Sequence, residues 1–130
     1  NKDEVSAEEV STMFGNLKFT TLELGRLTNE ADMALRVADF RVAKIANPNA
    51  DIALDQESSE ISLNVTDFSH HFDATIEQGL VRLPKSYENI DSQILDKGKK
   101  LRKITATYGN GTSGRISIKG KKGVVLLKEL

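Results

Sequence analysis

In the sequence Met-Ala-Leu-Arg-Val at residues 33–37, large apolar side chains alternate with a small one and a polar one, and a similar alternation returns in Ile-Ser-Leu at residues 61–63. An apolar residue at every second position is the period of a β-strand with one buried face, whereas a helix repeats its apolar residues every three to four positions. No window of the sequence carries a sustained helical stripe. The sequence therefore predicts an all-β fold.

Short apolar segments of this kind recur along the chain in two columns that keep the same order. One column begins its segments at Leu17, Phe40, Ile61, Val81 and Val124, and the other at Val10, Met33, Ile52, Ala74 and Ile116. Within each column the step is about 20 residues, with one interval of about twice that length, and such a period is typical of a solenoid. Two columns in phase favour one repeating architecture over chance.

The repeat predicts a single domain over residues 1–130, folded as a parallel β-solenoid of about five to six coils of roughly 20 residues. Each strand would pair in parallel with its equivalent one coil later, so that like residues stack into ladders. The two expected ladders are Phe40, Ile61, Val81 and Val124, and Leu35, Leu54, Ile76 and Ile118. An antiparallel sandwich is the alternative, because short strands at intervals of about 8–12 residues also fit that class.

The double-length interval interrupts this regularity. It contains a lysine-rich stretch at residues 97–103, a strand candidate at residues 104–108 and a glycine-rich run at residues 109–114 that leads into a strand at residues 115–118. The glycine-rich run is typical of a hairpin loop. We expect a hairpin-like irregularity near residues 97–118, either as a degenerate coil over residues 84–115 or as an insertion.

Several segments resemble a known family. Gly-Leu-Val-Arg-Leu-Pro at residues 79–84, Thr-Tyr-Gly-Asn-Gly at 107–111, Arg-Ile-Ser-Ile at 115–118 and Gly-Val-Val-Leu at 123–126 are similar to the closing coils of the bacterial auto-transporter adhesin family with the head GIN domain and of its adhesin-like relatives of unknown function. Phe-Gly-Asn-Leu-Lys-Phe at residues 14–19 is similar to their recurrent aromatic-glycine unit.

This resemblance implies a single-stranded right-handed parallel β-helix that is exported to the periplasm, the cell surface or the medium. It implies a non-enzymatic module with an adhesin-like binding or structural role, whose partner is a glycan or another envelope protein. The chain begins at Asn1 rather than at methionine, so we expect it to be the C-terminal part of a longer exported protein.

Composition excludes some functions. The 18 basic and 19 acidic residues give a net charge of −1, so no overall field attracts nucleic acid. Cysteine is absent, which removes disulfides and thiolate chemistry. No apolar run approaches the roughly 18 residues that span a bilayer, and no signal peptide is visible. We expect no cofactor.

Outward positions of the expected coils suggest a ligand site. Lys18, Arg41 and Arg82 would stack on one outer face together with Ser62 and Val125, as a basic strip for an acidic polysaccharide. A solvated surface of ion pairs is the favoured interpretation of these charges, and the basic strip is its alternative. Arg36, Asp55, Glu77 and Lys119 would stack on another face.

Two further patterns bear on catalysis and metal binding. A polysaccharide lyase or hydrolase is the alternative function, for which Asp55 and Glu77 on adjacent coils would supply the acids, although an ion-pair ladder explains them more simply. His70 and His71 are adjacent on a strand and would point to opposite faces, so we expect a polar corner there rather than a metal site. We therefore predict neither catalytic nor metal-binding residues.

The apolar C-terminal segment suggests self-association. As the last coil of a solenoid, Val124, Val125, Leu126 and Leu127 would present an unpaired edge to a partner.

Overall fold

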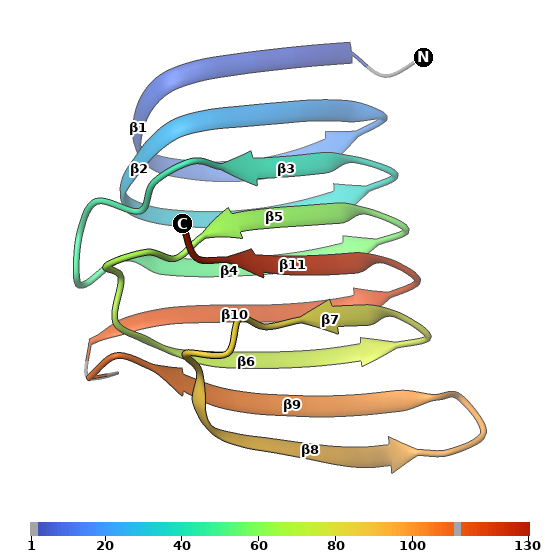
Figure 1. Cartoon of the computed structure of the whole chain (residues 1–130). Coiled ribbons are helices and arrows are strands. Elements are labelled where there is room, and N and C mark those ends of the chain that lie inside the picture. Colours follow the sequence, from blue (N-terminus) through green and yellow to red (C-terminus); the bar gives the residue numbers. More distant parts are fainter. Residues whose placement is uncertain (1–2, 111–112) are drawn as a thin grey trace.

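The chain folds into one all-β sheet, shown in Figure 1 as a computed structural model that describes residues 3–110 and 113–130. The strands of the described part are β1 (Asp3–Lys18), β2 (Thr20–Arg36), β3 (Asp39–Val42), β4 (Asp51–Glu57), β5 (Glu60–Asn64), β6 (His70–Glu77), β7 (Leu80–Arg82), β8 (Glu88–Asp96), β9 (Leu101–Tyr108), β10 (Gly114–Lys121) and β11 (Val124–Lys128). The prediction of an all-β fold is correct.

The sheet curls in the manner of a half-barrel, so that two rows of strands face each other across the core (Figure 1). The front row runs β3, β5, β11 and β7, and the back row runs β4, β10, β6, β9 and β8. The long strand β2 joins the rows, because its first part pairs with β3 and its last part with β4. Strand β1 follows β2 in parallel along its whole length.

The strand order shows that the predicted parallel β-helix of five to six coils is wrong. The first units pair in sequence order, since β1 pairs with β2, β2 with β4 and β3 with β5. Strand β10 then lies between β4 and β6, and β11 lies between β5 and β7, so these two units, which follow one another in the sequence, are not neighbours. Strand β9 runs antiparallel to both β6 and β8, which makes the sheet mixed. A repeat of about 20 residues reflects the combined length of two short strands and their connections, and it does not determine which strands pair.

The irregular interval also differs from the prediction. The hairpin joins β8 to β9 through residues 97–100, whereas β9 and β10 do not pair with each other and instead lie on the two sides of β6. The expected hairpin loop at residues 109–114 is therefore a crossover, and its residues 111–112 lie outside the described part.

Left-handed residues build the corner where the back row turns into the front row. Phe19, Val37 and Ser58 have φ angles of 53°, 50° and 51°, and Lys122 and Gln78 have 52° and 54°. The backbone N–H of Val37 donates to the carbonyl of Glu57 at 3.0 Å, and equivalent bonds link the other corners. The alternation that begins at Leu17 and at Met33 would place Phe19 and Val37 inward. They are 54% and 39% exposed, because the corner turns their side chains outward.

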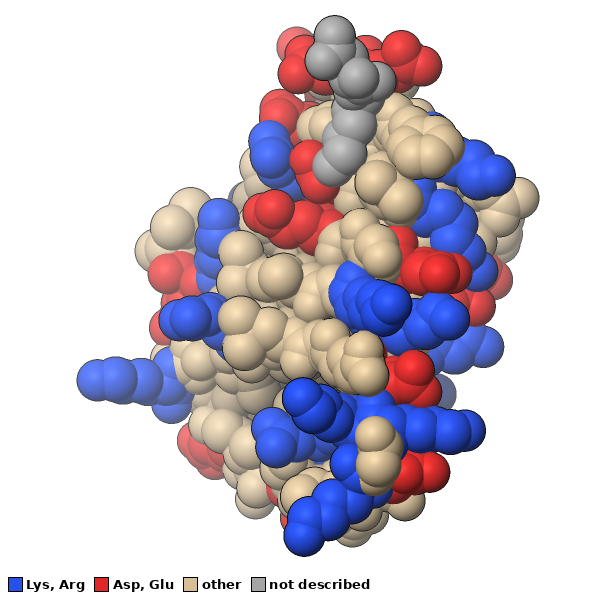
Figure 2. Space-filling model, turned by 90° about the vertical axis from the view of Figure 1, so that its right-hand side faces the viewer, with Lys and Arg blue, Asp and Glu red and all other residues tan. Residues whose placement is uncertain are grey.

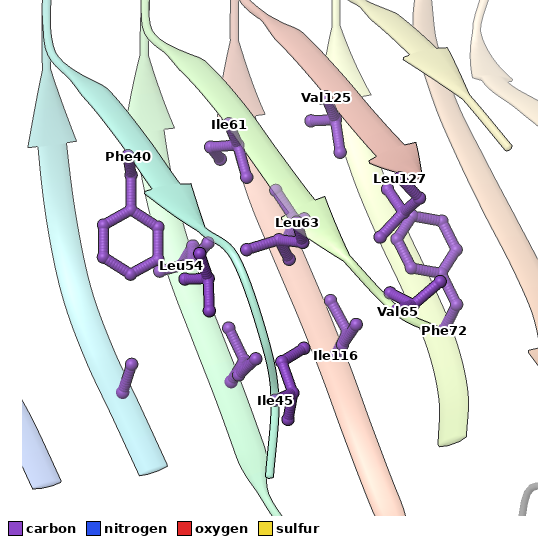
Figure 3. Packing of buried hydrophobic residues seen from close by; sticks show 14 of the residues in the cluster. Phe40, Ile45, Leu54, Ile61, Leu63, Val65, Phe72, Ile116, Val125 and Leu127 are labelled. Atoms are coloured by element: carbon purple, nitrogen blue, oxygen red, sulfur yellow. The ribbon is translucent and has the colours of Figure 1, made fainter. Parts of the chain in front are cut away.

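The front-row ladder corrects the phase of the last strand. Phe40 pairs with Ile61, Ile61 with Val125, and Val125 with Val81 (Figure 3). The expected ladder contained Val124, which instead pairs with Glu60. Val125, which we placed on the outer face, is 0% exposed.

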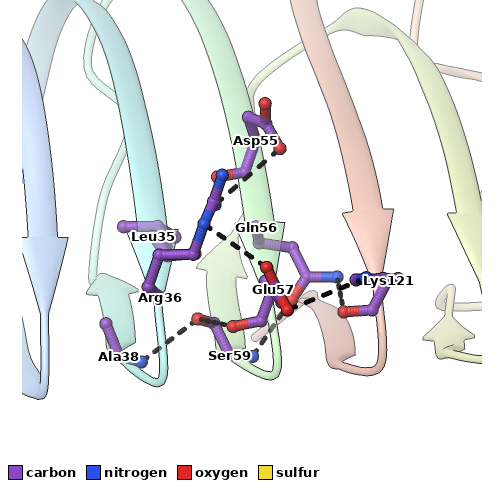
Figure 4. A network of polar contacts seen from close by, with 8 residues as sticks. All are labelled: Leu35, Arg36, Ala38, Asp55, Gln56, Glu57, Ser59 and Lys121. Atoms are coloured by element: carbon purple, nitrogen blue, oxygen red, sulfur yellow. Dashed lines mark hydrogen bonds and ion pairs between the residues drawn. The ribbon is translucent and has the colours of Figure 1, made fainter.

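The back-row ladder is shifted by two residues from the prediction. Leu54 aligns with Met33 and Ile118, while Leu35 aligns with Gln56. Gln56 is buried, and its amide is satisfied because Oε1 accepts from the Ser59 backbone N–H at 3.0 Å (Figure 4). Its strand neighbour is Gly120, where a Cβ would lie 1.7 Å from the Gln56 carbonyl oxygen, so only glycine fits.

Strand β11 is not a terminal edge. It pairs with β5 on one side and with β7 on the other, and Val125 and Leu127 are buried in the core. The segment Val124–Lys128 therefore does not offer the free edge through which we expected self-association. Whether the chain self-associates is not tested by the strand order, and self-association stays a prediction.

Candidate binding groove on the outer face of the sheet

The strand pairing aligns outward side chains of the back row into two adjacent rows. One row consists of Phe14, Asp32, Ala53, Ser117 and Asp73, and the other of Asn16, Ala34, Asp55, Lys119 and Thr75. The rows cross β1, β2, β4, β10 and β6, one residue per strand. Because successive strands lie about 4.8 Å apart, five strands extend over about 19 Å.

These rows line an open groove of about 760 Å³. Short side chains line its floor, because the middle of the rows is occupied by Ala34, Ala53 and Ser117. Longer polar side chains surround this floor, including Asp32 and Lys119. The alternation of small and long side chains at outward strand positions is what hollows the surface.

An exposed aromatic ring stands beside one end of the groove. Phe14 pairs in register with Asp32 and is 64% exposed, and its neighbours Gly15 and Asn16 line the groove. A phenyl ring in water is unfavourable unless it meets a partner, so this ring is a candidate contact for a ligand.

The groove is acidic on balance. Asp32, Asp55 and Asp73 line it together with one cation, Lys119. A network at its edge holds Arg36 between two carboxylates: Nη1 lies 3.9 Å from Asp55 Oδ1 and Nε lies 3.5 Å from Glu57 Oε2 (Figure 4). Arg36 and Asp55 are both substantially exposed, so this pair adds little stability but restrains the Asp55 carboxylate.

The structure brings only part of the predicted strip together. Arg41, Ser62 and Arg82 share one row on the front of the sheet, with Leu126 in place of Val125. Lys18 instead aligns with Arg36 on the back row. Arg41 is also paired with Glu23 at 2.9 Å, so of the three predicted ligand cations only Arg41 and Arg82 share a row, and one of them already has an acidic partner.

The second predicted outer row is split as well. Asp55 pairs with Lys119 in the groove, whereas Arg36 aligns with Glu57, Lys121 and Glu77 in the next row. Asp55 and Glu77, the candidate acids for an enzyme, therefore lie on strands that β10 separates and in different rows.

Sequence reasoning missed a buried polar cluster around His70. His70 is fully buried and stacks on Phe68 with ring centroids 4.8 Å apart. Its Nδ1 lies 2.7 Å from the Phe68 carbonyl oxygen and its Nε2 lies 2.7 Å from the Tyr87 hydroxyl oxygen. The expected polar corner is wrong for His70, although the two histidines do point to opposite faces and His71 is exposed.

Tyr108 and Glu129 extend this cluster to the surface. The Tyr108 hydroxyl donates to Glu129, and the Ser86 hydroxyl donates to Glu129 Oε1 at 2.6 Å. Hydrogen bonds from Ser86 and Tyr108 lower the pKa of Glu129, and burial together with the Glu129 hydrogen bond raises the pKa of Tyr108 to about 12. The cluster thus ties the C-terminus to the loop before β8. The sequence contains only a weak signal of this cluster, because its two tyrosines are far apart in the chain.

Within residues 3–110 and 113–130, no three histidine, aspartate or glutamate side chains are placed to hold a metal ion. The same residues form no helix long and apolar enough to cross a membrane. No protein-family model, curated protein or solved structure matches the chain. The resemblance to the adhesin family stays a prediction, and function must be argued from the groove itself.

Proposed function

We propose that this chain is a non-enzymatic binding module of the bacterial cell envelope, and that it holds an extended oligosaccharide in the groove on the back row. The supporting observation is the groove itself: hydrogen-bonding side chains surround a floor of small residues, and the exposed ring of Phe14 stands at one end. Ligand sites commonly combine a concave surface with a few placed polar groups.

The side chains of the groove suit hydroxyl groups. Carboxylates such as Asp32 and Asp73 accept hydrogen bonds from hydroxyls, while Lys119 and the Asn16 amide donate to them. Sugar rings also have apolar faces of C–H groups, which pack on aromatic rings such as Phe14. A span of about 19 Å accommodates several linked rings in line.

Charge decides the class of sugar. Three carboxylates and one lysine give the groove an excess of negative charge, which repels uronate or sulfated polymers and favours neutral or amino sugars. This differs from the acidic polysaccharide that the sequence suggested. A lyase or hydrolase is less favoured, because Asp55 and Glu77 do not face each other across a cleft as a pair of catalytic carboxylates must.

The test compares two exposed phenylalanines. Binding of the chain to immobilised neutral, amino and uronate oligosaccharides is measured for the parent, for Phe14→Ala and for the matched control Phe19→Ala, which removes another exposed ring, at the corner. We expect binding to neutral or amino sugars that Phe14→Ala weakens about tenfold, or about 1.4 kcal/mol, and that Phe19→Ala leaves unchanged.

Two results would contradict the proposal. One is equal loss in both variants, and the other is binding restricted to uronate polymers. New reducing ends released from any polymer would show that the module is an enzyme.

A further inference from the structure

The front row of the sheet ends two strands before the back row. Strand β7 is the last strand of the front row and lies opposite β6, whereas the back row continues beyond β6 through β9 and β8 (Figure 1). The inner face of the β8–β9 hairpin is therefore not covered by a front-row strand. In the rest of the sheet this inner position is filled by the packed core.

This step in the sheet forms a second groove, of about 590 Å³. Its apolar lining consists of Ile76, Leu80, Val81, Ile94, Leu101 and Ile104. Ile94 is 62% exposed and Leu80 is also exposed. Strand β7 pairs with β11 along one edge, and within the described part of the chain no strand pairs with its other edge, which borders the groove.

Cations occupy the end of the groove that lies at the corner. Lys97, Lys100 and Arg102 line it, and all three are exposed. Among the described residues none of them has an ion-pair partner. Figure 2, which views the corner side, shows acidic side chains around the β1 end of the molecule and lysines and arginines gathered toward the β8–β9 end. The groove thus combines a free strand edge, an apolar wall and unpaired positive charge.

We propose that this groove binds an extended, acidic peptide segment of a partner protein, which adds a strand to the free edge of β7. Main-chain hydrogen bonds to β7 supply affinity that is independent of sequence, as in other cases of strand addition. The peptide residue that aligns with Val81 faces inward, because Val81 continues the buried ladder of Phe40, Ile61 and Val125. That residue must be apolar, and carboxylates at the corner end of the peptide meet Lys97 and Lys100.

A second copy of the chain does not fit as the occupant. Strand β1 forms the opposite end of the sheet. Its first half lies in the front row and its second half in the back row, so both rows end together there. A copy stacked below β7 would bring the last half of its β1 to the place that β9 already fills. The hairpin therefore blocks continuation of the sheet by identical molecules and leaves room for a single added segment.

The chain contains a suitable probe. Residues 3–10, Asp-Glu-Val-Ser-Ala-Glu-Glu-Val, form a front-row strand in which Val5 aligns with the inward Leu22 and the two acidic residues stand at the corner end. A fluorescent peptide of this sequence, with blocked ends, has the required pattern. Its charge-reversed counterpart, Lys-Lys-Val-Ser-Ala-Lys-Lys-Val, is the control for the cationic end.

The experiment measures peptide binding by fluorescence anisotropy, with variants on strand β8 and in the hairpin loop that follows it. We expect the acidic peptide to bind, the reversed peptide to bind at least tenfold more weakly, and affinity to fall as salt is raised. Ile94→Asp and the double variant Lys97→Glu with Lys100→Glu should each weaken binding at least tenfold. Ile90→Asp, at a residue of the same strand that is 57% exposed but does not line the groove, should leave binding unchanged.

Other outcomes overturn the proposal. They are absence of binding by the parent, equal loss in Ile94→Asp and Ile90→Asp, or equal binding of the two peptides. Concentration-dependent self-association that the acidic peptide abolishes would identify a second copy as the occupant and would also refute the assignment to a partner. Phe14→Ala should not affect the peptide, which keeps this test separate from the oligosaccharide groove.

Discussion

His70 should make the stability of the fold sensitive to mild acid. The Phe68 carbonyl can only accept a hydrogen bond, so Nδ1 of His70 carries the proton and Nε2 accepts from the Tyr87 hydroxyl. This is a neutral imidazole with both nitrogens occupied. Burial away from water lowers the pKa of His70 from 6.5 to about 4, against a weaker opposing contribution from the Phe68 carbonyl.

The sign and size of the effect follow from linkage. Above pH 6.5 the histidine is neutral in both the folded and the unfolded chain, so it contributes no pH dependence. Between pH 6.5 and about 4 the unfolded chain binds a proton that the folded chain does not bind, and the free energy of unfolding falls. At about 1.4 kcal/mol per pH unit, the loss reaches about 3 kcal/mol near pH 4 and then stops increasing.

Urea unfolding at pH 7.5, 6.5, 5.5 and 4.5 measures this loss. The variant His70→Phe should be less stable at pH 7.5, because it leaves the buried Tyr87 hydroxyl without its acceptor, but it should lose about 2–3 kcal/mol less than the parent on acidification. His71→Gln, at the exposed neighbour, removes only the smallest of the causes that shift the pKa of His70, the charge of His71, so it should change the pH dependence far less than His70→Phe does. Identical pH dependence in His70→Phe and the parent would refute the reasoning, since the remaining acid effects, such as protonation of Glu129, are common to both.

The other predictions concern the register and the strand order. Val125→Asp should prevent folding by burying an unpaired charge, whereas Leu126→Asp, one residue along and half-buried, should cost far less in urea unfolding; equal effects would mean that the phase of β11 is wrong. Gly120→Ala should destabilise by more than 3 kcal/mol because its Cβ would overlap the Gln56 carbonyl, while Gly15→Ala, with nearly the same φ but no atom within 4 Å of the new methyl group, should cost only the backbone strain of about 1 kcal/mol. Comparable losses in thermal unfolding would show that the Gln56 contact is not tight. A chain that ends at residue 113 should not fold, because β4 and β6 would each lose the strand between them, and a synthetic peptide of residues 114–130 should restore strand circular dichroism; a folded truncated chain would contradict the observed strand order.

Local pattern was enough to find most strands and their buried faces. Ile61 and Leu63 alternate with polar residues, Ile52 and Leu54 alternate with small or polar ones, and all four are buried as predicted. The phase of β11 could not be read in this way, because Val124–Leu127 is apolar at every position. Its phase is instead visible in the pairing, where Val125 aligns with the buried Ile61 and Val124 with Glu60.

The strand order and the groove depend on contacts that local pattern does not encode. Ala53 and Ser117 are adjacent on the groove floor although they are far apart in the sequence, because β10 inserts beside β4. A solenoid of sequential coils would have placed β4 beside β6 instead. The predicted direction of the side chains of Phe19 and Val37 was wrong for a different reason. Phenylalanine and valine rarely adopt a left-handed backbone, so their presence does not indicate a corner.

Amide chemical shifts of the labelled chain, mapped during titration with a neutral or amino-sugar oligosaccharide, show whether the back-row groove is the ligand site. The structure predicts that the amides of Asp32, Ala53, Ser117 and Asp73 shift together, as one stripe across four strands, while those of Arg41 and Arg82 on the front row do not. Shifts that centre on Arg41 and Arg82, or the absence of shifts with every such sugar, would contradict it.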